Sequence, residues 1–312
     1  MANKTWLFAS SNPENEAGLF QWMLGCCHQQ AITLRIVVVL PKLGHHVFDW
    51  FETQQHQDLI KKQTEYEMHK RQQWLDLAEA QQVDLAIEVR FGKLFYESIQ
   101  VANETNVELL IKQTEDIEQK DNLLFESVDW HLLRKSPVPL LLYRPKSPLP
   151  FKNIMASVDV DIETRPFQPS QFNQSLLSWA QRFNHKTPLN VVHAWQSDVD
   201  HLVRHWNTDL DESALIKLNE QLYLEHKKAL DVELAAHFFQ SQKPKVLLCK
   251  GEPAHSISSA VLEQNVDLLV LGTLGRSGLP GLLIGNTAED LLERVNCSVL
   301  AIKPSTFKSP II

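Results

Sequence analysis

Residues 266–272 read VDLLVLG, and this apolar run ending in glycine decides the fold that we predict for the chain. A similar run, VELLI, stands at residues 107–111, which is 159 positions earlier. Continuous apolar runs of about four to eight residues are typical of strands buried on both faces of a parallel sheet. Two such runs at a fixed spacing indicate an internal repeat.

Further matches at the same spacing support a tandem duplication. They pair Leu132-Leu133 with Leu291-Leu292, Arg144-Pro145 with Lys303-Pro304, and Gly92 with Gly251. Upstream the spacing shrinks, mostly because a longer loop rich in proline and glutamine, residues 165–171, follows the first strand of the second copy. We therefore predict two domains, residues 1–147 and 151–305, with a proline-rich boundary between them.

Strand-like and helix-like patterns alternate along each half. In the first half the expected strands are 5–10, 34–40, 86–89, 108–112 and 139–143, and the expected helices are 15–27, 57–81, 94–103 and 125–134. In the second half the expected strands are 153–158, 189–195, 245–249, 267–272 and 298–302, and the expected helices are 170–183, 212–239, 253–264 and 287–295. Such alternation favours right-handed βαβ units. The expected class is α/β, with two tandem doubly wound, five-stranded parallel sheets.

Composition and charge narrow the class of function. The chain has 312 residues, of which 44% are hydrophobic and 22% charged, as in ordinary globular proteins. No apolar run approaches the roughly 18 residues of a membrane span, and the first residues lack a signal-peptide pattern. A net charge of −8 argues against broad binding to nucleic acid or anionic membranes. Four cysteines form no disulfide framework, so we expect a reduced, cytoplasmic protein.

Half of the ten glycines fall between residues 272 and 285, a segment that we call the glycine loop. It follows an expected strand and precedes an expected helix, where ligands bind in open α/β sheets. Glycines let backbone amides approach an anion, and a helix start adds unpaired N–H donors. Arg276, Asn286 and Thr287 would add a charge, an amide and a hydroxyl. This is the chemistry of a nucleotide phosphate site, but the spacing alone fits a loop whose glycines only make turns equally well.

The spacing Gly272-x2-Gly275-x9-Gly285 resembles the ATP-binding signature of the universal stress protein family. The stretches NTAE at 286–289, SVLAIKP at 298–304 and DWHLLRK at 129–135 are also similar to that family. The duplicated layout resembles its tandem-domain members over nearly the whole chain. The resemblance implies an adenine-nucleotide alpha-hydrolase-like fold with strand order 3-2-1-4-5. It also implies a stress-response role and an intramolecular pairing of the two halves through their last strands.

The resemblance also implies which residues hold the nucleotide. Asp159, after the first strand of the second half, would hold the adenosine, and the backbone near Ala194 would meet the adenine. The phosphate contacts would come from Gly272, Gly275, Arg276, Gly285, Asn286 and Thr287. The family signature has serine or threonine directly after the third glycine, whereas this chain has asparagine there and threonine one position later. This departure argues against the family's contact to the γ-phosphate more than against nucleotide binding. The expected cofactor is ATP, with magnesium left open.

The first half lacks these features. At the positions of the three glycines and the arginine it has Gln113, Asp116, Glu126 and Ile117, and Asn12 stands in place of the aspartate. Residues 115–121 carry four carboxylates and one lysine, which would repel phosphates by about 1 kcal/mol per pair near 4 Å in bulk water and by more when buried. We predict that the first half binds no ATP in this mode.

Other side chains offer weaker signals. The 13 histidines, including His45-His46 and His56, show no metal-ligand spacing and favour solvated surfaces. His255, at the start of an expected helix, is better explained by a helix-cap or surface role than by a place in the ligand cleft of the second half. Aromatic residues gather around the long helices, at 47–51 and at Trp206, Tyr223, Phe238 and Phe239. Packing explains them best, and the alternative is an apolar cavity for a hydrophobic ligand, for which the first half is the expected place.

We therefore expect a regulator or interaction module that binds one ATP in its second half and acts on protein partners that the sequence does not identify. A slow ATPase is the first alternative, although no catalytic constellation is evident. A nucleotide-free scaffold with a cavity for a hydrophobic ligand is the second. The expected chain is a monomer built as an internal pair, and a homodimer of tandem chains is left open.

Overall fold

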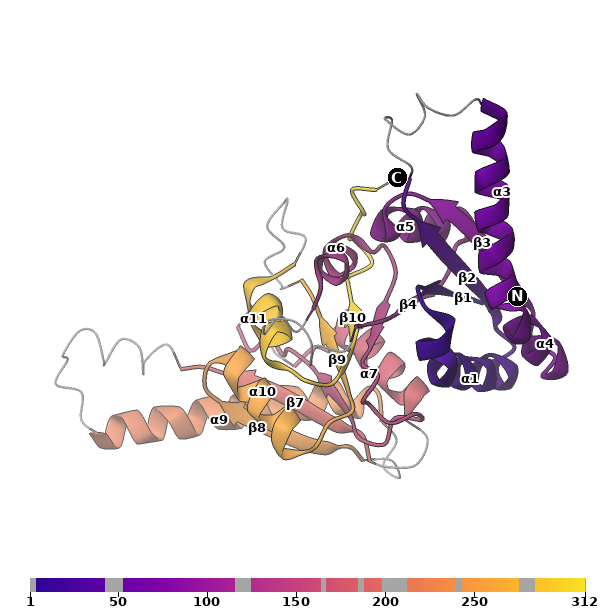
Figure 1. The fold of residues 1–312 in the computed structure, drawn as a ribbon. Helices are drawn as coiled ribbons and strands as arrows, with labels where there is room; N and C mark the ends of the chain where they lie inside the picture. The colour runs from indigo at the N-terminus through magenta and orange to yellow at the C-terminus, as the bar shows by residue number, and fades with distance from the viewer. Residues whose placement is uncertain are drawn as a thin grey trace. The chain divides into compact units, whose positions relative to one another are not determined.

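The computed structural model describes residues 4–42, 53–115, 125–163, 167–184, 188–197, 212–238, 243–274 and 284–311. The chain divides into two compact units (Figure 1). The first comprises Met1–Leu149 together with Ser305–Ile312, and the second comprises Pro150–Pro304. The second unit is thus inserted, in sequence, between two parts of the first.

The first unit is built on a parallel sheet with strand order β3-β2-β1-β4-β5. Its strands are β1 (Thr5–Ser10), β2 (Thr33–Leu40), β3 (Leu85–Phe91), β4 (Leu109–Gln113) and β5 (Leu140–Tyr143). Its helices are α1 (Pro13–Gln30), α3 (Thr53–Lys70), α4 (Gln72–Ala80), α5 (Leu94–Thr105) and α6 (Ser127–Lys135). Phe8 on the central strand pairs in register with Ile36 and Ile111, and all three side chains are fully buried.

The second unit repeats this plan with strand order β8-β7-β6-β9-β10. Its strands are β6 (Ile154–Ser157), β7 (Asn190–Trp195), β8 (Lys245–Lys250), β9 (Leu268–Gly272) and β10 (Ser298–Ile302). Its helices are α7 (Gln171–Phe183), α9 (Glu212–Ala235), α10 (Pro253–Glu263) and α11 (Asn286–Arg294). Counted along each unit, both sheets run 3-2-1-4-5. The predicted α/β class and strand order are therefore confirmed.

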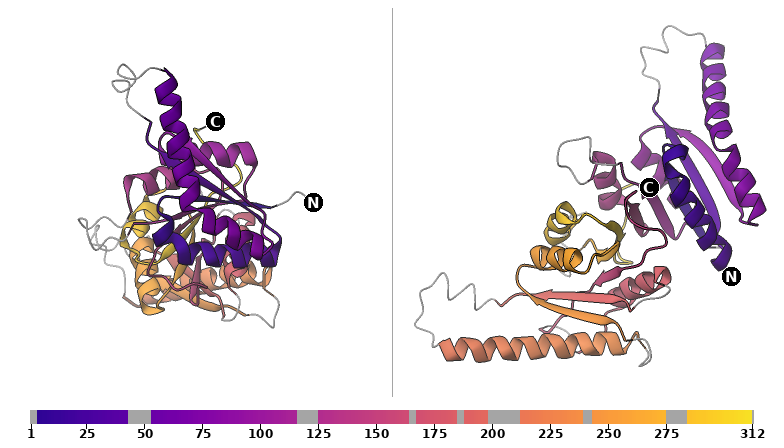
Figure 2. Two further views of the ribbon diagram at one scale, coloured as in Figure 1. Left: turned by 45° about the vertical axis from the view of Figure 1, so that its right-hand side comes forward. Right: turned by 60° about the horizontal axis from the view of Figure 1, so that its bottom comes forward.

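Helices cover both faces of each sheet (Figure 2). In the first unit α1 and α4 share one face, where the rings of Phe20 and Trp74 stack with centroids 4.3 Å apart. The helices α5 and α6 lie on the other face (Figure 2). In the second unit α7 and α9 share one face and α10 and α11 the other. Each sheet is therefore doubly wound, which leaves the carboxyl ends of its strands as the place for a ligand.

The internal repeat extends to the ends of the helices. The bounds of α6 and α11 lie 159 positions apart at both ends, as do those of β4 and β9 at both ends. After α5 and α10 the chain turns at Asn106 and Asn265, which share a φ of +48°. Asparagine tolerates this left-handed conformation better than other residues that carry a side chain. The two copies thus share the left-handed asparagine that follows the helix at this position.

The helix expected at 57–81 is interrupted, and α3 and α4 meet at Arg71. The backbone there has φ −105° and ψ 8°, which is outside the α-helical range. The side chain of Arg71 is fully buried, and its guanidinium donates to Ser10 Oγ and to Glu67 Oε2. The helical pattern of residues 57–81 gives no sign of this break, because the partner that holds Arg71, Ser10, lies 61 positions away in the sequence.

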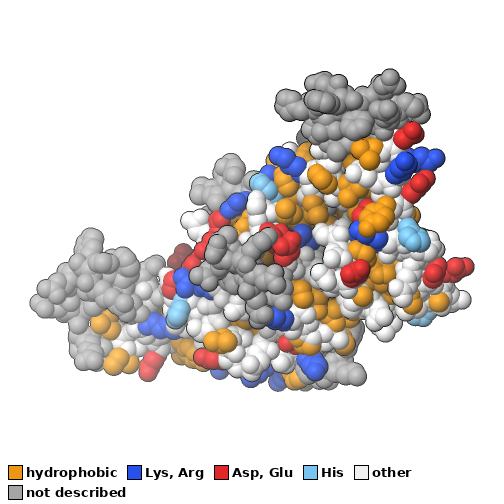
Figure 3. Space-filling model, in the orientation of Figure 1, with side chains coloured by type: hydrophobic (Ala, Val, Ile, Leu, Met, Phe, Trp, Pro, Cys, Tyr) orange, Lys and Arg blue, Asp and Glu red, His pale blue; other side chains and the backbone are white. Residues whose placement is uncertain are grey.

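The surface carries charges of both signs. On the face shown in Figure 3, lysine and arginine side chains are interspersed with aspartate and glutamate. No helix in the described ranges is both long enough and apolar enough to cross a membrane.

Lys303, which follows β10, makes the stability of the second unit depend on pH. It is partly buried, and burial lowers the pKa of its ammonium group to about 7. The unfolded value is about 10.4, so between these values the unfolded chain holds one more proton and stability rises with pH, by at most ~1.4 kcal/mol per unit. We expect Lys303→Met to be more stable than wild type at pH 6, with the difference shrinking towards pH 10. Urea unfolding at several pH values measures this, and parallel profiles would contradict it.

Candidate functional site

The two ends of the glycine loop meet at the carboxyl ends of β9 and β10. Thr273 N, directly after β9, donates to the carbonyl of Ile302 at 3.0 Å. Gly285 N donates in turn to the carbonyl of Thr273 at 2.7 Å. Gly285 is the N-cap of α11, so these two bonds fix the start of that helix beside the ends of two strands. The first N–H groups of a helix have no partner within it, and they favour an anion.

Two of the predicted phosphate ligands occupy the first turn of α11. Asn286 and Thr287 are both exposed there, whereas Ala288 is buried against the unit. Both side chains are therefore accessible at the start of the helix, and their contact with a phosphate stays a prediction. Gly275 and Arg276, the other predicted ligands in the loop, lie outside the described residues.

Thr273 is a polar residue of the loop that sequence analysis missed. Its side chain is fully buried, and its Oγ1 makes no hydrogen bond to any described residue. A buried hydroxyl without a partner is costly, and such groups gather at places that receive a ligand or water. The signal in the sequence was a hydroxyl residue directly after the first glycine of the loop.

Gly272 has a packing role. A Cβ atom built on it would lie 2.6 Å from a ring carbon of Phe172, which belongs to α7. Any side chain at this position would force the ring of Phe172 to move, so the packing of that ring favours glycine here. The packing of Phe172 is therefore one reason for a glycine at this position. Contact between Gly272 and a phosphate stays a prediction.

Asp159 and Ala194 lie at the same edge of the sheet as the glycine loop. Asp159 follows β6, and the buried amide of Asn173 holds its backbone: Nδ2 donates to the Asp159 carbonyl at 2.8 Å, and Oδ1 accepts from the Asp159 amide at 3.3 Å. The Asp159 residue is exposed. Ala194 lies near the end of β7, in register with Cys249. Neighbouring parallel strands end at one edge, so the fold gathers these residues around one crevice.

A histidine pair beside Ala194 was also missed by sequence analysis. His193 is buried, and its Nε2 lies 2.9 Å from Nδ1 of His226 in α9. Its Nδ1 lies 3.2 Å from the carbonyl of Val158, which only accepts. Neutral His193 therefore carries its proton on Nδ1 and accepts a hydrogen bond from His226. The His226 ring also stacks on Trp195, with centroids 5.2 Å apart. The two histidines are 33 positions apart, so no local pattern joins them.

In the first unit, carboxyl groups occupy the equivalent helix start. Glu126 is the N-cap of α6, where the second unit has glycine. Burial, and next the carboxyl of Glu115, raise the pKa of Glu126 above its usual value. The Glu126 amide already donates to Asp129 Oδ2 at 3.1 Å. The other Asp129 oxygen forms an ion pair with the buried Lys112, at 2.9 Å. This arrangement opposes an additional anion at the start of α6.

The crevice beyond β1 in the first unit is filled by its own polar side chains. The buried Glu16 accepts hydrogen bonds from Ser10 Oγ at 2.7 Å and from the amide of Ser11 at 2.9 Å. Arg71 donates to the same Ser10 hydroxyl at 2.9 Å. Asn12, the counterpart of Asp159, uses its Oδ1 to cap α1 by accepting from Glu14 N at 3.1 Å. Each of these groups is thus engaged within the unit.

Comparison with known proteins agrees with this duplicated fold. The model of the universal stress protein family matches residues 4–144 and 151–303. The chain belongs to the universal stress protein family. It carries two such domains in tandem.

Relatives match this universal stress protein over most of both chains. It is 28% identical to the universal stress protein E homolog of Haemophilus influenzae over 258 residues, 81% of this chain and 79% of that one. It is 28% identical to universal stress protein E of Photorhabdus laumondii over 73% of this chain and 72% of that one. The crystal structure of a universal stress protein from Archaeoglobus fulgidus covers 97% of this chain and 99% of its own, with a TM-score of 0.63 at 15% identity. These likenesses support a role in the stress response.

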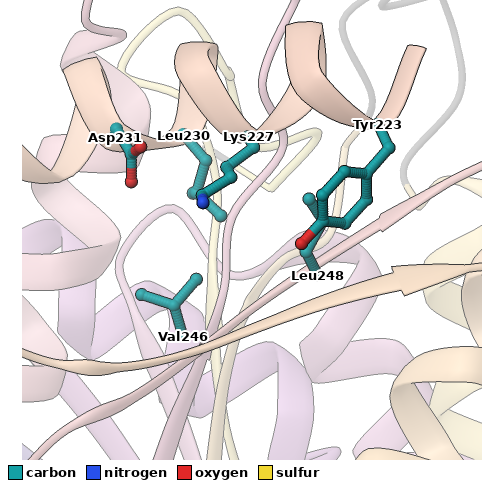
Figure 4. Close-up of a pocket in the computed structure, with 6 residues that line it drawn as sticks. All are labelled: Tyr223, Lys227, Leu230, Asp231, Val246 and Leu248. Atoms are coloured by element: carbon teal, nitrogen blue, oxygen red, sulfur yellow. The ribbon is translucent and has the colours of Figure 1, made fainter. Parts of the chain in front are cut away.

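This universal stress protein also has a cavity between its long helix α9 and the edge strand β8 (Figure 4). The cavity measures about 210 Å³ and is lined by Tyr223, Lys227, Leu230, Asp231, Val246 and Leu248. Among the described side chains of α9, those from Ser213 to Lys228 include none that is fully buried. Sequence analysis favoured packing as the role of the aromatic residues at 47–51, with a cavity in the first half as the alternative, and these residues lie outside the described residues. Binding of a hydrophobic ligand in a cavity between a long helix and the sheet stays an alternative hypothesis.

The histidines are also candidate metal ligands. In the part of the chain that the structure describes, no group of three or more His, Cys, Asp and Glu side chains is placed to hold a metal ion. His45-His46 lies outside the described residues, and His255 is an exposed residue in the first turn of α10.

Proposed function

We propose that this tandem universal stress protein binds one adenine nucleotide, with ATP as the expected ligand, in its second unit. The observation that carries the proposal is the pair of backbone bonds through Thr273, which set the start of α11 beside the ends of β9 and β10. A helix start at this edge of the sheet, with Asn286 and Thr287 exposed in its first turn, supports an anion site there. The family resemblance of the glycine spacing adds independent support.

The remaining contacts are those that the family resemblance and the charge of Arg276 imply. Asp159 and the backbone near Ala194 would bind the nucleoside, and Arg276 would add one positive charge at the phosphates. A magnesium ion would share the phosphate oxygens. If the nucleotide binds one conformation of the glycine loop more tightly than another, its binding shifts the equilibrium towards that conformation. The protein would thereby present different surfaces to its partners with and without ligand, which is the action of a regulator.

Calorimetric titration of the full chain with ATP tests the proposal. We expect about one ATP per chain. Gly285→Glu places at the N-cap of α11 the residue that the first unit has at the N-cap of α6, and it should weaken binding about 100-fold, or ~2.7 kcal/mol, through charge repulsion. Gly275→Asp imports the first-half residue in the same way. The matched control is Glu126→Gly, which makes the reverse exchange and should leave affinity and stoichiometry unchanged.

Each result of the titration has a definite meaning. Failure to bind ATP, or binding that survives Gly285→Glu, would refute the glycine-loop site. Two ATP per chain would refute the reading of the first unit as inactive. Phosphate release in the same samples separates binding from the alternative of slow ATP hydrolysis.

A further inference from the structure

The chain beyond the second unit returns to the first. After β10 it passes through Lys303 and Pro304 into residues 305–311, which we call the strap. The strap belongs to the first unit, although 155 residues of the second unit separate it from the rest of that unit in sequence. A segment that crosses back in this way needs specific contacts to stay in place.

Hydrogen bonds fix the strap to α5 and α6. Ser309 Oγ donates to the carbonyl of Lys135, the last residue of α6, at 2.7 Å. The same oxygen accepts from the amide of Ile311 at 3.1 Å, so one hydroxyl joins the helix end to the strap. Asn103 Nδ2, from α5, donates to the carbonyl of Ile311 at 3.0 Å. The last carbonyls of a helix have no partner within it, and Ser309 supplies one.

Burial of one apolar side chain completes the contact. Ile311 is 9% exposed, whereas Ser305, Thr306, Lys308 and Pro310 are exposed. The strap contains no helix or strand; Ser309 and Ile311 fix it, and Phe307 is half-buried. Four of its seven residues are exposed, which is typical of a segment that opens locally while the rest of the unit stays folded.

We propose that the surface formed by Asn103 of α5 and the end of α6 is a peptide-binding site, and that its occupant is the strap of the same chain. The strap releases and rebinds without unfolding of the first unit. Because it is tethered, its effective concentration at the site is on the order of millimolar, which favours the chain's own segment over one from another molecule. The partner that fits the empty surface is an extended segment with a hydroxyl two residues before an aliphatic side chain.

Amide hydrogen exchange of the full chain tests the site. We expect the strap and the last turn of α6 to be protected in wild type. Ile311→Asp and, independently, Asn103→Leu should speed exchange in both segments at least tenfold, while the rest of α5 and the sheet are unchanged. Thr306→Ala changes an exposed strap residue and is the matched control, which should behave as wild type.

Addition in trans separates a binding site from passive packing. A synthetic peptide of residues 305–312, at millimolar concentration, should restore protection of α6 in the Ile311→Asp variant. The same peptide with Ser309→Ala should not restore it. The proposal is overturned by unprotected strap amides in wild type, by an α6 that exchanges at the same rate in all variants, or by a peptide without effect.

Discussion

Replacing Arg71 by methionine should destabilise the first unit by about 3–5 kcal/mol, because the change leaves buried acceptors without their partner. The Arg71 side chain is fully buried and forms an ion pair with Glu67 at 2.6 Å. It also donates to the hydroxyl of Ser10 and to the carbonyl of Ser11. Methionine preserves the length of the side chain but supplies none of these hydrogen bonds.

The effect of Arg71→Met should shrink in acid. Burial raises the pKa of Glu67, but hydrogen bonds from Arg71 and Lys70 outweigh it, so the net pKa lies below the usual value. A carboxyl with a lowered folded pKa stabilises the fold above its unfolded pKa, and that contribution is lost as pH falls through the folded value. The difference between variant and wild type should therefore be largest near neutral pH and smaller below about pH 4.

Urea unfolding at pH 7 and pH 3.5 measures both effects. Arg294→Met is the matched control, because Arg294 pairs with Asp290 at the same helical spacing, at 2.9 Å, but with side chains 46% and 41% exposed. Exposed pairs of this kind contribute at most about 1 kcal/mol. Equal losses from the two variants would contradict the role that we assign to the buried network.

Removing one member of the Lys112–Asp129 ion pair should lower the free energy of unfolding about as much as Arg71→Met does. Replacing both members should lower it far less. Their side chains are 5% and 0% exposed, so either single change leaves one uncompensated buried charge, at about 3–5 kcal/mol. The second unit has Leu271 and Ala288 at the corresponding positions, both buried. Transferring that pair, as Lys112→Leu with Asp129→Ala, should recover most of the loss.

A double-mutant cycle in urea gives the coupling between the two sites. We expect the double variant to lie within about 1–2 kcal/mol of wild type, with the residual loss due to the cap of α6, because Asp129 also accepts from Glu126 N at 3.1 Å. Lys61 and Glu65, an exposed pair 3.9 Å apart, provide a control cycle that should show almost no coupling. Additive losses at Lys112 and Asp129 would show that the charges act separately.

Most of the fold could be predicted from the sequence because it depends on local patterns. The apolar run before Gly272 and its counterpart at 107–111 became β9 and β4, within one or two residues of the expected bounds. The start of α11 was expected at Thr287 and lies at Asn286. Buried strands need continuous apolar side chains, and glycine marks the turn that follows, so these signals are contained in a few adjacent residues.

The candidate site was predicted in part, for the same reason. Gly285 and Thr287 were placed at a helix start from the local pattern, whereas Asp159 and Ala194 were named through the family resemblance. The buried hydroxyl of Thr273 and the pair of His193 with His226 depend on contacts between separate elements. Sequence spacing does not contain those contacts.

The sequence by itself determined the duplication, the order of strands and helices, and the loss of the glycine loop from the first half. Only the tertiary structure decided where Arg71, Lys112 and the strap lie. Charged residues are mostly exposed, so the pattern gave no reason to place an arginine or a lysine in the interior. Their burial depends on partners that folding brings together from distant positions, such as Ser10 for Arg71 and Lys135 for Ser309.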